Sequence, residues 1–163
     1  MNQLRNNILG TALWWIEQQC FENSQNRGKC IDYLHERYSS SWIDQKRNEA
    51  YCAKFVSIVL KEAFQKTGAV SPIYSAGARD LRNQARAKGV KIDRNPSSGA
   101  FFYKKSSSPK YTGHVGIVYE NIDGNRFKTI EGNATDPVTK KEGVVSVIRS
   151  VDSDPSQIGR AHV

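Results

Sequence analysis

A cysteine and a histidine, about sixty positions apart, give this chain residue types suited to thiol chemistry. Cys52 lies near the start of Asn48–Phe64, a stretch whose apolar residues recur at helical spacing. Asn48 suits the N-cap position and Glu49 the first turn, where a carboxylate complements the helix dipole. A thiol at this place meets unpaired backbone N–H groups, which favour the attacking thiolate. The alternative is a small buried cysteine on a core helix.

The histidine lies in a predicted hairpin. Gly113–Glu120 and Asn125–Asn133 have the aromatic and β-branched content of strands, and they flank Asn121-Ile-Asp-Gly124. Asp-Gly is a strong signal for a two-residue turn. If Asp123 and Gly124 form that turn, the pairing of every residue in the two strands is fixed.

This register places three polar residues on one face of the hairpin. His114 faces Asn133, and Gly116 faces Glu131, which leaves space for the carboxylate to lean toward the imidazole. Glu131 is then diagonal to His114 at roughly 7–8 Å between backbones, within reach of a long side chain. A three-residue turn without a bulge would shift the pairing by one residue and separate them.

The chemistry that suits these residues is thiol acyl transfer. His114 would take the proton of Cys52 and later protonate the leaving amine, while Glu131 or Asn133 orients the ring. The backbone N–H of Cys52 and a nearby polar side chain would stabilise the oxyanion. Alone, His114 could equally be a strand histidine packed against the core. The combination of a cysteine at a helix start and a polar hairpin face favours catalysis.

The remaining sequence predicts the elements that position these residues. Helices are expected first and strands afterwards, which indicates an α+β fold with an antiparallel sheet of about five strands. His35 is expected to be solvated or to cap its helix. The predicted helices cover 3–18, 30–38, 48–64 and 77–88, and the predicted strands cover 100–103, 113–120, 126–131, 144–148 and 158–162.

Composition describes an ordinary globular protein. The chain has 163 residues, 38% of them hydrophobic and 25% charged, and we expect residues 1–163 to form one domain. A net charge of +8 and a pI of about 9.5 favour an anionic partner, whether nucleic acid, anionic lipid or a cell-wall polymer. The basic residues are scattered, and no stripe of basic and aromatic residues is present, so nucleic acid is the least favoured.

The cysteines and histidines show no metal-site spacing, and we expect no metal and no cofactor. Cys20 and Cys30 are close enough to pair, which would leave Cys52 free, but two reduced thiols are an equal alternative. Residues 1–16 contain no convincing signal peptide, and no run is long enough to span a membrane. We therefore expect a protein made in the cytoplasm, without stable membrane insertion.

These motifs resemble the CHAP domain (cysteine, histidine-dependent amidohydrolase/peptidase) of the papain-like, NlpC-type cell-wall hydrolases. The resemblance covers about residues 8–162. It rests on five segments, in matching order and spacing: Asn26-Arg-Gly28, Tyr51-Cys-Ala-Lys-Phe-Val-Ser57, Gly113-His-Val-Gly-Ile-Val118, Thr129-Ile-Glu-Gly-Asn133, and Glu142-Gly-Val-Val with Ile148-Arg-Ser150.

The resemblance implies Cys52 as nucleophile, His114 as base, and Glu131 and Asn133 as the other polar members. It also implies peptidoglycan as substrate, cut at the muramoyl–alanine amide or within the stem peptide or its crosslink. Two departures are visible: Tyr51 stands where the family usually has Trp, and Ser98-Gly-Ala-Phe-Phe102 lacks the family's aspartate. The acidic calcium-binding loop of some relatives is not evident.

The sequence thus predicts a peptidoglycan hydrolase that works through a cysteine acyl-enzyme, monomeric, acting at the periplasm or cell wall after release. It would be a phage-type lysin with a holin-type partner, or an antibacterial toxin delivered by a contractile secretion machine and blocked by an immunity protein. The alternatives are a catalytically silent wall-binding module and a thiol acyltransferase acting on a protein.

Overall fold

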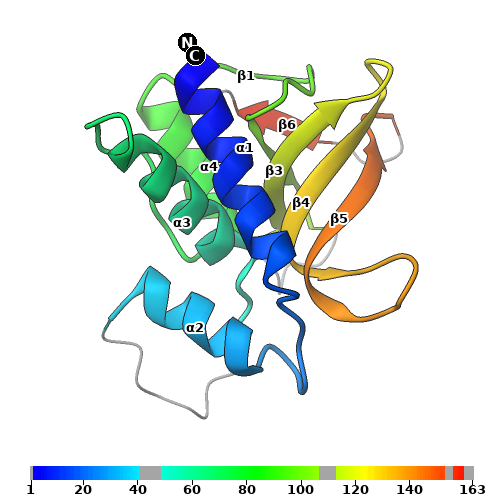
Figure 1. Ribbon diagram of the computed structural model, residues 1–163. Coiled ribbons are helices and arrows are strands. Elements are labelled where there is room, and N and C mark those ends of the chain that lie inside the picture. Colours follow the sequence, from blue (N-terminus) through cyan, green and yellow to red (C-terminus); the bar gives the residue numbers. More distant parts are fainter. Residues whose placement is uncertain (1, 41–48, 107–112, 153–155, 160–163) are drawn as a thin grey trace.

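The computed structural model describes residues 2–40, 49–106, 113–152 and 156–159. Within these residues helices come first and an antiparallel sheet follows, so the predicted α+β class is confirmed (Figure 1). The helices are α1 (Asn2–Glu17), α2 (Lys29–Tyr38), α3 (Cys52–Gln65) and α4 (Ala78–Ala87). The strands are β1 (Ile92–Asp93), β2 (Phe101–Lys104), β3 (His114–Asn121), β4 (Arg126–Thr135), β5 (Glu142–Ser150) and β6 (Ser156–Gly159).

The described strands form one sheet in the order β1-β6-β2-β3-β4-β5, with every neighbouring pair antiparallel. Five of these strands overlap the five predicted ones. The sixth, β1, is two residues long and was not predicted, because a run this short has no periodicity to detect. Part of the predicted strand 158–162 lies outside the described residues. Strands β3 and β4, which carry His114 and Glu131, are neighbours in this sheet, between β2 and the edge strand β5.

Helix α3 is the element around which the others pack. Ten of its 14 residues are buried, because it lies against α1 and α2 and against β3 and β4 (Figure 1). Gly132 of β4 lets the strand come close, since a Cβ added there would lie 2.8 Å from the Cβ of Phe55. The apolar spacing that predicted an amphipathic helix therefore belongs to the central helix of the core.

The start of α3 differs from the prediction. The helix begins at Cys52, and its N-cap residue is Tyr51, which has no side-chain capping bond of its own. The Tyr51 N–H instead donates to Oδ1 of Asn133 in β4, at 3.1 Å. Asn48, the predicted N-cap, lies outside the described residues, and Glu49 precedes the helix. Cys52 is consequently the first residue of α3.

The hairpin of β3 and β4 reaches the predicted register by a different route. Its turn has three residues, Asp123 to Asn125, and Asn121 pairs with Phe127, one position away from the predicted pairing. A bulge at Tyr119 then shifts the pairing back, so that Ile117 pairs with Ile130 as predicted. The extra turn residue and the bulge offset each other, and the face that carries His114 is kept.

The structure contains a disulfide between Cys20, just after α1, and Cys30 in α2, with an S–S distance of 2.08 Å. It leaves Cys52 as the free thiol. The sequence left this pairing open. The two cysteines meet because α1 ends where the chain turns back into α2, which brings their Cα atoms within 5.1 Å.

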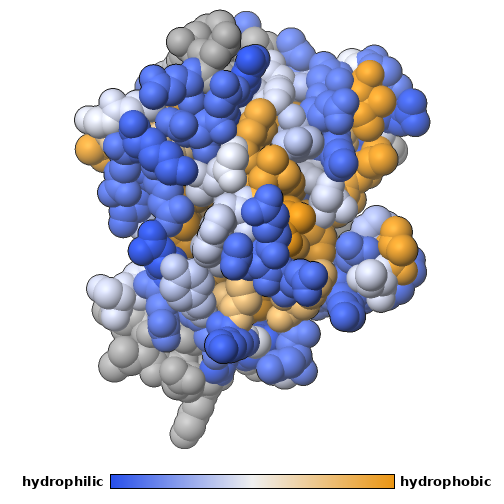
Figure 2. Space-filling view, in the orientation of Figure 1, coloured by the Kyte–Doolittle hydropathy of each residue, from blue (hydrophilic) through white to orange (hydrophobic). Residues whose placement is uncertain are grey.

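Helix α1 is part of the folded core, with Ile8, Ala12 and Trp15 fully buried. None of the described helices has the length and apolar content needed to cross a bilayer. The face shown in Figure 2 is mostly hydrophilic, with hydrophobic residues gathered along its middle where α1 meets the strands. A second buried cluster, on the other side of the sheet, contains Ala100, Phe102, Val118, Phe127 and Val151.

Candidate active site

His114 and Glu131 meet as the predicted register requires. His114 is the first residue of β3, and its Nε2 lies 2.6 Å from Oε2 of Glu131 in β4. Gly116 provides the space for this contact, because a Cβ there would lie 2.7 Å from Cγ of Glu131 and 2.6 Å from the ring of Phe102. The prediction that these two side chains lie together on one face is confirmed.

Cys52 meets the same imidazole from the other side. Its side chain lies close enough to the imidazole of His114 to help raise the pKa of that ring, and the residue is only 7% exposed. Because Nε2 of His114 is turned to Glu131, Nδ1 is the ring nitrogen left for the thiol. As the first residue of α3, Cys52 also has a backbone N–H that no helical carbonyl can accept. The three side chains form a continuous series from thiol to imidazole to carboxylate.

The surroundings of His114 favour its charged form. Burial alone would lower the pKa of the imidazole, but the hydrogen bonds and charges of Cys52 and Glu131 outweigh it and raise the pKa to about 9. The side chain is 22% exposed, so it is shielded yet reachable. His114 is thus able to hold a proton at neutral pH and to release it to a basic leaving group.

Glu131 is fully buried and has more partners than the sequence indicated. Arg149 in β5 donates to both of its oxygens, each at 2.6 Å, and the Thr129 hydroxyl bonds to Oε1. Burial would raise the pKa of Glu131, but the bonds from Arg149 and His114 lower it to about 2. The carboxylate therefore stays ionised and its position is fixed by four contacts.

Arg149 is the residue of this cluster that sequence reasoning missed. The predicted strand stopped at residue 148, so Arg149 had no assigned face. In the structure it pairs across from Phe127, on the same face as Glu131, and its guanidinium lies 5.3 Å from the centre of the Phe102 ring. The sequence did contain a signal for this placement. Arg149 follows Val145 and Val147 at intervals of two, and residues two apart in a strand share a face.

Asn133 is not where the unbroken ladder would place it. The pairing of β4 with β5 shifts between Glu131 and Ala134, and Asn133 has a φ of +59°. Its Oδ1 accepts the Tyr51 N–H, so Glu131 rather than Asn133 holds the His114 ring in this arrangement. The expectation that Asn133 pairs directly with His114 is corrected by this bulge.

An open cleft of about 1000 Å³ lies over the polar face. The described residues that line it include Lys104, Lys105, His114, Asn133, Thr135 and Arg149. Asn133 and His114 thus share the cleft although they do not bond to each other. Lysine and arginine are present on its described walls, whereas aspartate and glutamate are not. The cleft is a cationic site, and the His114 imidazole is part of its lining.

Comparison with known proteins identifies the arrangement. Residues 21–133 match the model of the CHAP domain. The chain belongs to the CHAP domain family. No curated protein matches the chain. The solved structure "The crystal structure of Ly7917" is 17% identical, covers 96% of this chain with a TM-score of 0.47, and is itself covered to 62% of its length, so this likeness carries no argument.

The CHAP match includes Cys52, His114, Glu131 and Asn133, whereas Arg149 lies beyond its end. The family is one of hydrolases of the amidase and peptidase type. Among the described residues, no group of three or more His, Cys, Asp or Glu side chains is arranged to hold a metal ion.

The CHAP domain contains a second histidine cluster, away from the cleft. His35 of α2 is fully buried, not solvated as the sequence predicts. Its Nδ1 lies 2.9 Å from Nζ of Lys54, and its Nε2 lies 3.4 Å from the carbonyl oxygen of Asn26. Lys54 in turn pairs with Glu49 at 2.6 Å. Burial and the charge of Lys54 lower the pKa of His35, which keeps this imidazole neutral.

Proposed function

We propose that this CHAP domain hydrolyses amide bonds of peptidoglycan through an acyl-enzyme on Cys52. The observation that carries the proposal is the series of Cys52, His114 and Glu131, in which His114 lies between the thiol and the carboxylate and lines an open cleft. Thiol hydrolases need a nucleophile, a base within reach of it and a group that orients the base. Membership of the CHAP family supports peptidoglycan as the substrate. The bond is the muramoyl–alanine amide or one within the stem peptide or crosslink.

The proposed reaction has two halves. His114 holds the proton that the thiol has given up, and Sγ of Cys52 attacks the carbonyl carbon; the tetrahedral intermediate then collapses as His114 gives that proton to the leaving amine. Water then attacks the thioester, His114 accepts a proton from it, and the free carboxylate is released as the thiol re-forms. Glu131 keeps the ring oriented through Nε2 and stabilises its charged form in both halves.

Two donors are placed to stabilise the oxyanion. The first is the Cys52 N–H at the start of α3. We assign the second to the side-chain amide of Asn133, which lines the cleft. Because its Oδ1 accepts the Tyr51 N–H, the amide nitrogen is turned away from that bond and remains a donor.

The charge of the cleft supports an acidic substrate. Lys104 and Lys105 lie on its wall, and the chain carries a net charge of +8. Stem peptides bear free carboxylates, and the wall as a whole is anionic, so both the local and the overall charge favour encounter.

We place the site of action at the cell wall, after release from the cytoplasm. The Cys20–Cys30 disulfide supports this, because disulfides persist in oxidising compartments outside the cytosol. Delivery would be as a phage lysin with a holin-type partner or as an antibacterial toxin with an immunity protein that covers the cleft. A neighbouring gene for a small membrane protein favours the lysin, and one for a periplasmic binding partner favours the toxin.

The test is mass spectrometry of fragments released from purified peptidoglycan by the wild type and by Cys52→Ala. We expect defined peptide or muramoyl fragments from the wild type alone, and their masses identify the bond. Equal release by both proteins would show that Cys52 is not the nucleophile. Release by neither protein, with retained binding to the polymer, would favour a wall-binding module, and incorporation of an added amine would favour acyl transfer.

A further inference from the structure

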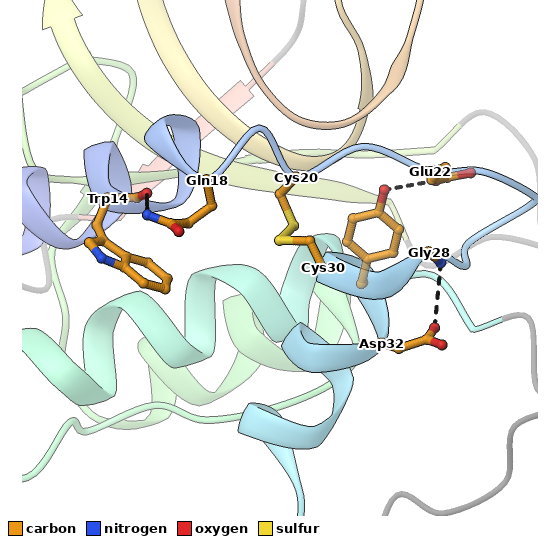
Figure 3. Close-up of a disulfide and its surroundings, with 8 residues drawn as sticks. Trp14, Gln18, Cys20, Glu22, Gly28, Cys30 and Asp32 are labelled. Carbon is orange, nitrogen blue, oxygen red and sulfur yellow. Dashed lines mark hydrogen bonds between the residues drawn. A yellow bond between two sulfur atoms is a disulfide. The ribbon is translucent and has the colours of Figure 1, made fainter.

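The segment between α1 and α2 is held at both ends. The Cys20–Cys30 disulfide closes it, and Figure 3 shows the bridge joining the end of α1 to the start of α2 with Glu22 nearby. Cys20 is fully buried. Residues 21–29 therefore form a short closed loop, which we call the stapled loop.

The stapled loop contacts the residue that precedes the nucleophile. The Tyr51 hydroxyl donates a hydrogen bond to Oε1 of Glu22, at 2.7 Å. Tyr51 is fully buried, and burial and Glu22 together raise the pKa of its phenol well above the ordinary value, so it remains a donor. Through its own N–H, Tyr51 also bonds to Asn133 at the cleft. Tyr51 thus connects the stapled loop to both Cys52 and Asn133.

The position of Glu22 depends on the shape of the loop. Its other oxygen, Oε2, accepts the N–H of Asn26 at 2.9 Å, so the carboxylate is oriented by the loop itself. The loop is fixed on its far side by β5, since the Glu22 N–H donates to the Glu142 carbonyl and the Val144 N–H donates to the Cys20 carbonyl, each at 2.8 Å. The disulfide is the covalent closure of this arrangement.

We propose that Glu22, held by the Cys20–Cys30 disulfide, is a positioning residue for Cys52, and that the hydrolase becomes fully active only when this disulfide has formed. The proposal rests on the proposed role of Cys52 as nucleophile. Formation is a two-electron oxidation by thiol–disulfide exchange. The thiols of Cys20 and Cys30 lose two protons and join, while the disulfide of an oxidant protein or small molecule is reduced to two thiols.

The physical reason is that acyl transfer tolerates little displacement of the reacting groups. An open loop samples more conformations than a closed one, so without the disulfide the Glu22 carboxylate spends less time on Tyr51. Tyr51 is adjacent to Cys52, and a displacement of about 1 Å at a reacting group can reduce the rate on the order of 100-fold. A reducing cytoplasm would then hold the enzyme at low activity until it is released.

The first experiment compares the oxidised wild type with Cys20→Ser/Cys30→Ser, in which Cys52 is the single cysteine. We expect kcat on soluble peptidoglycan fragments to fall on the order of 10–100-fold with KM nearly unchanged. We also expect the rate and pH profile of Cys52 alkylation by iodoacetamide to change. Val151→Ala, which removes apolar contacts in the second buried cluster and none of the hydrogen bonds of the stapled loop, is the control for loss of stability.

The second experiment leaves the disulfide intact and removes the contact. Tyr51→Phe keeps the core packing and deletes the hydroxyl, and Glu22→Ala deletes its acceptor. Each is expected to lower kcat by a similar factor, and the two together by no more than either alone, because they act through one bond. Glu22→Gln keeps an acceptor oxygen and is expected to retain most of the activity.

Some outcomes would overturn the proposal. One is unchanged kcat and alkylation in Cys20→Ser/Cys30→Ser, and another is a loss no larger than that of Val151→Ala at equal melting temperature. Full activity in Tyr51→Phe would exclude the route through Glu22. Alkylation requires no peptidoglycan, so a changed alkylation profile in a protein that releases no fragments would leave this inference standing while the proposed function fails.

Discussion

His114 and His35 have the same kinds of neighbours and opposite tendencies. Each lies in a cluster with one glutamate and one basic side chain, and each cluster is near the start of α3, one beside Cys52 and the other containing Lys54. The pKa of His114 is raised to about 9, whereas that of His35 is lowered. Burial lowers the pKa of both rings, so the opposite outcomes depend on which charged group contacts each imidazole.

In the first cluster the carboxylate is in the middle. Glu131 touches His114 and Arg149, so the imidazole meets a negative group. In the second cluster the ammonium is in the middle, because Lys54 touches both His35 and Glu49. The imidazole meets a positive group and stays neutral. Burial lowers the pKa of both histidines, and the group in direct contact decides whether that effect is outweighed, as at His114, or reinforced, as at His35.

Exposure separates the clusters further. His114 opens onto the cleft, while His35 is fully buried with its second nitrogen near the Asn26 carbonyl. A proton-transfer residue needs access to substrate as well as a suitable pKa. Only the His114 cluster meets both conditions among the described residues, and the following predictions test this contrast.

The largest effect on kcat is expected from replacing each histidine separately with glutamine. His114→Gln should lower kcat by about 10²–10⁴-fold, the usual loss of general acid–base catalysis. His35→Gln should lower kcat by less than about tenfold, because it touches no reacting group and reaches Cys52 only through Asn26 of the stapled loop and the Tyr51 ring. Steady-state kinetics on soluble peptidoglycan fragments measure both.

His35→Gln should still lower the free energy of unfolding, by roughly 1–2 kcal/mol, since it disturbs buried hydrogen bonds. Urea denaturation supplies this control, because a lowered free energy of unfolding shows that the substitution disturbs the protein even where kcat is kept. Comparable losses of kcat in the two variants would contradict the division of the clusters into catalytic and structural.

The next effect separates the two cations. Arg149→Met should lower the free energy of unfolding by about 3 kcal/mol, because it leaves Glu131 buried without its main partner. Lys54→Met should cost about 1 kcal/mol or less, since the Glu49 that it leaves behind is 36% exposed and can be solvated. The burial of the carboxylate that is left without its cation therefore determines how much stability is lost.

Urea denaturation at pH 7 measures both values, and Arg149→Lys is the matched variant that keeps the charge but not the two-pronged geometry. It should fall between the wild type and Arg149→Met. A loss in Lys54→Met as large as that in Arg149→Met would show that exposure of the remaining carboxylate does not matter.

The sequence predicted one cluster and not the other for physical reasons. The pairing of His114 with Glu131 follows from strand alternation and turn signals, which are local. The expected two-residue turn was wrong, but the bulge at Tyr119 restored the register, so the prediction survived. The burial of a core face constrains register more strongly than a turn does.

The features that were missed depend on residues distant in sequence. The N-terminus of α3 is held by Asn133, 82 positions beyond Tyr51, rather than by a neighbouring cap. The role of Arg149 requires the register of β4 against β5. The burial of His35 requires that Lys54 of α3 lies against α2. Alternation along β5 could assign Arg149 to a face, but local patterns do not identify the partners, because each contact forms only when separate elements pack.

The smallest effect is the pH dependence of stability, which the two histidines should control on opposite sides of pH 6.5. The pKa of His114 is raised in the folded state, so its contribution is present below 6.5 and is lost as pH rises toward about 9. A rise from 6.5 to about 9 sets an upper limit of about 3 kcal/mol. The pKa of His35 is lowered, so its contribution is present above 6.5 and is lost as pH falls.

The free energy of unfolding should therefore be greatest near pH 6.5 and decline on both sides. Urea denaturation from pH 5 to 9.5 tests this, and each variant should remove one side only. His114→Gln should flatten the alkaline decline, and His35→Gln should reduce the acid decline, where the low pKa of Glu131 adds nothing until the pH falls below about 4.5. If one variant flattened both sides, the two clusters would be coupled through α3, and the order of groups around each imidazole would no longer explain the difference between them.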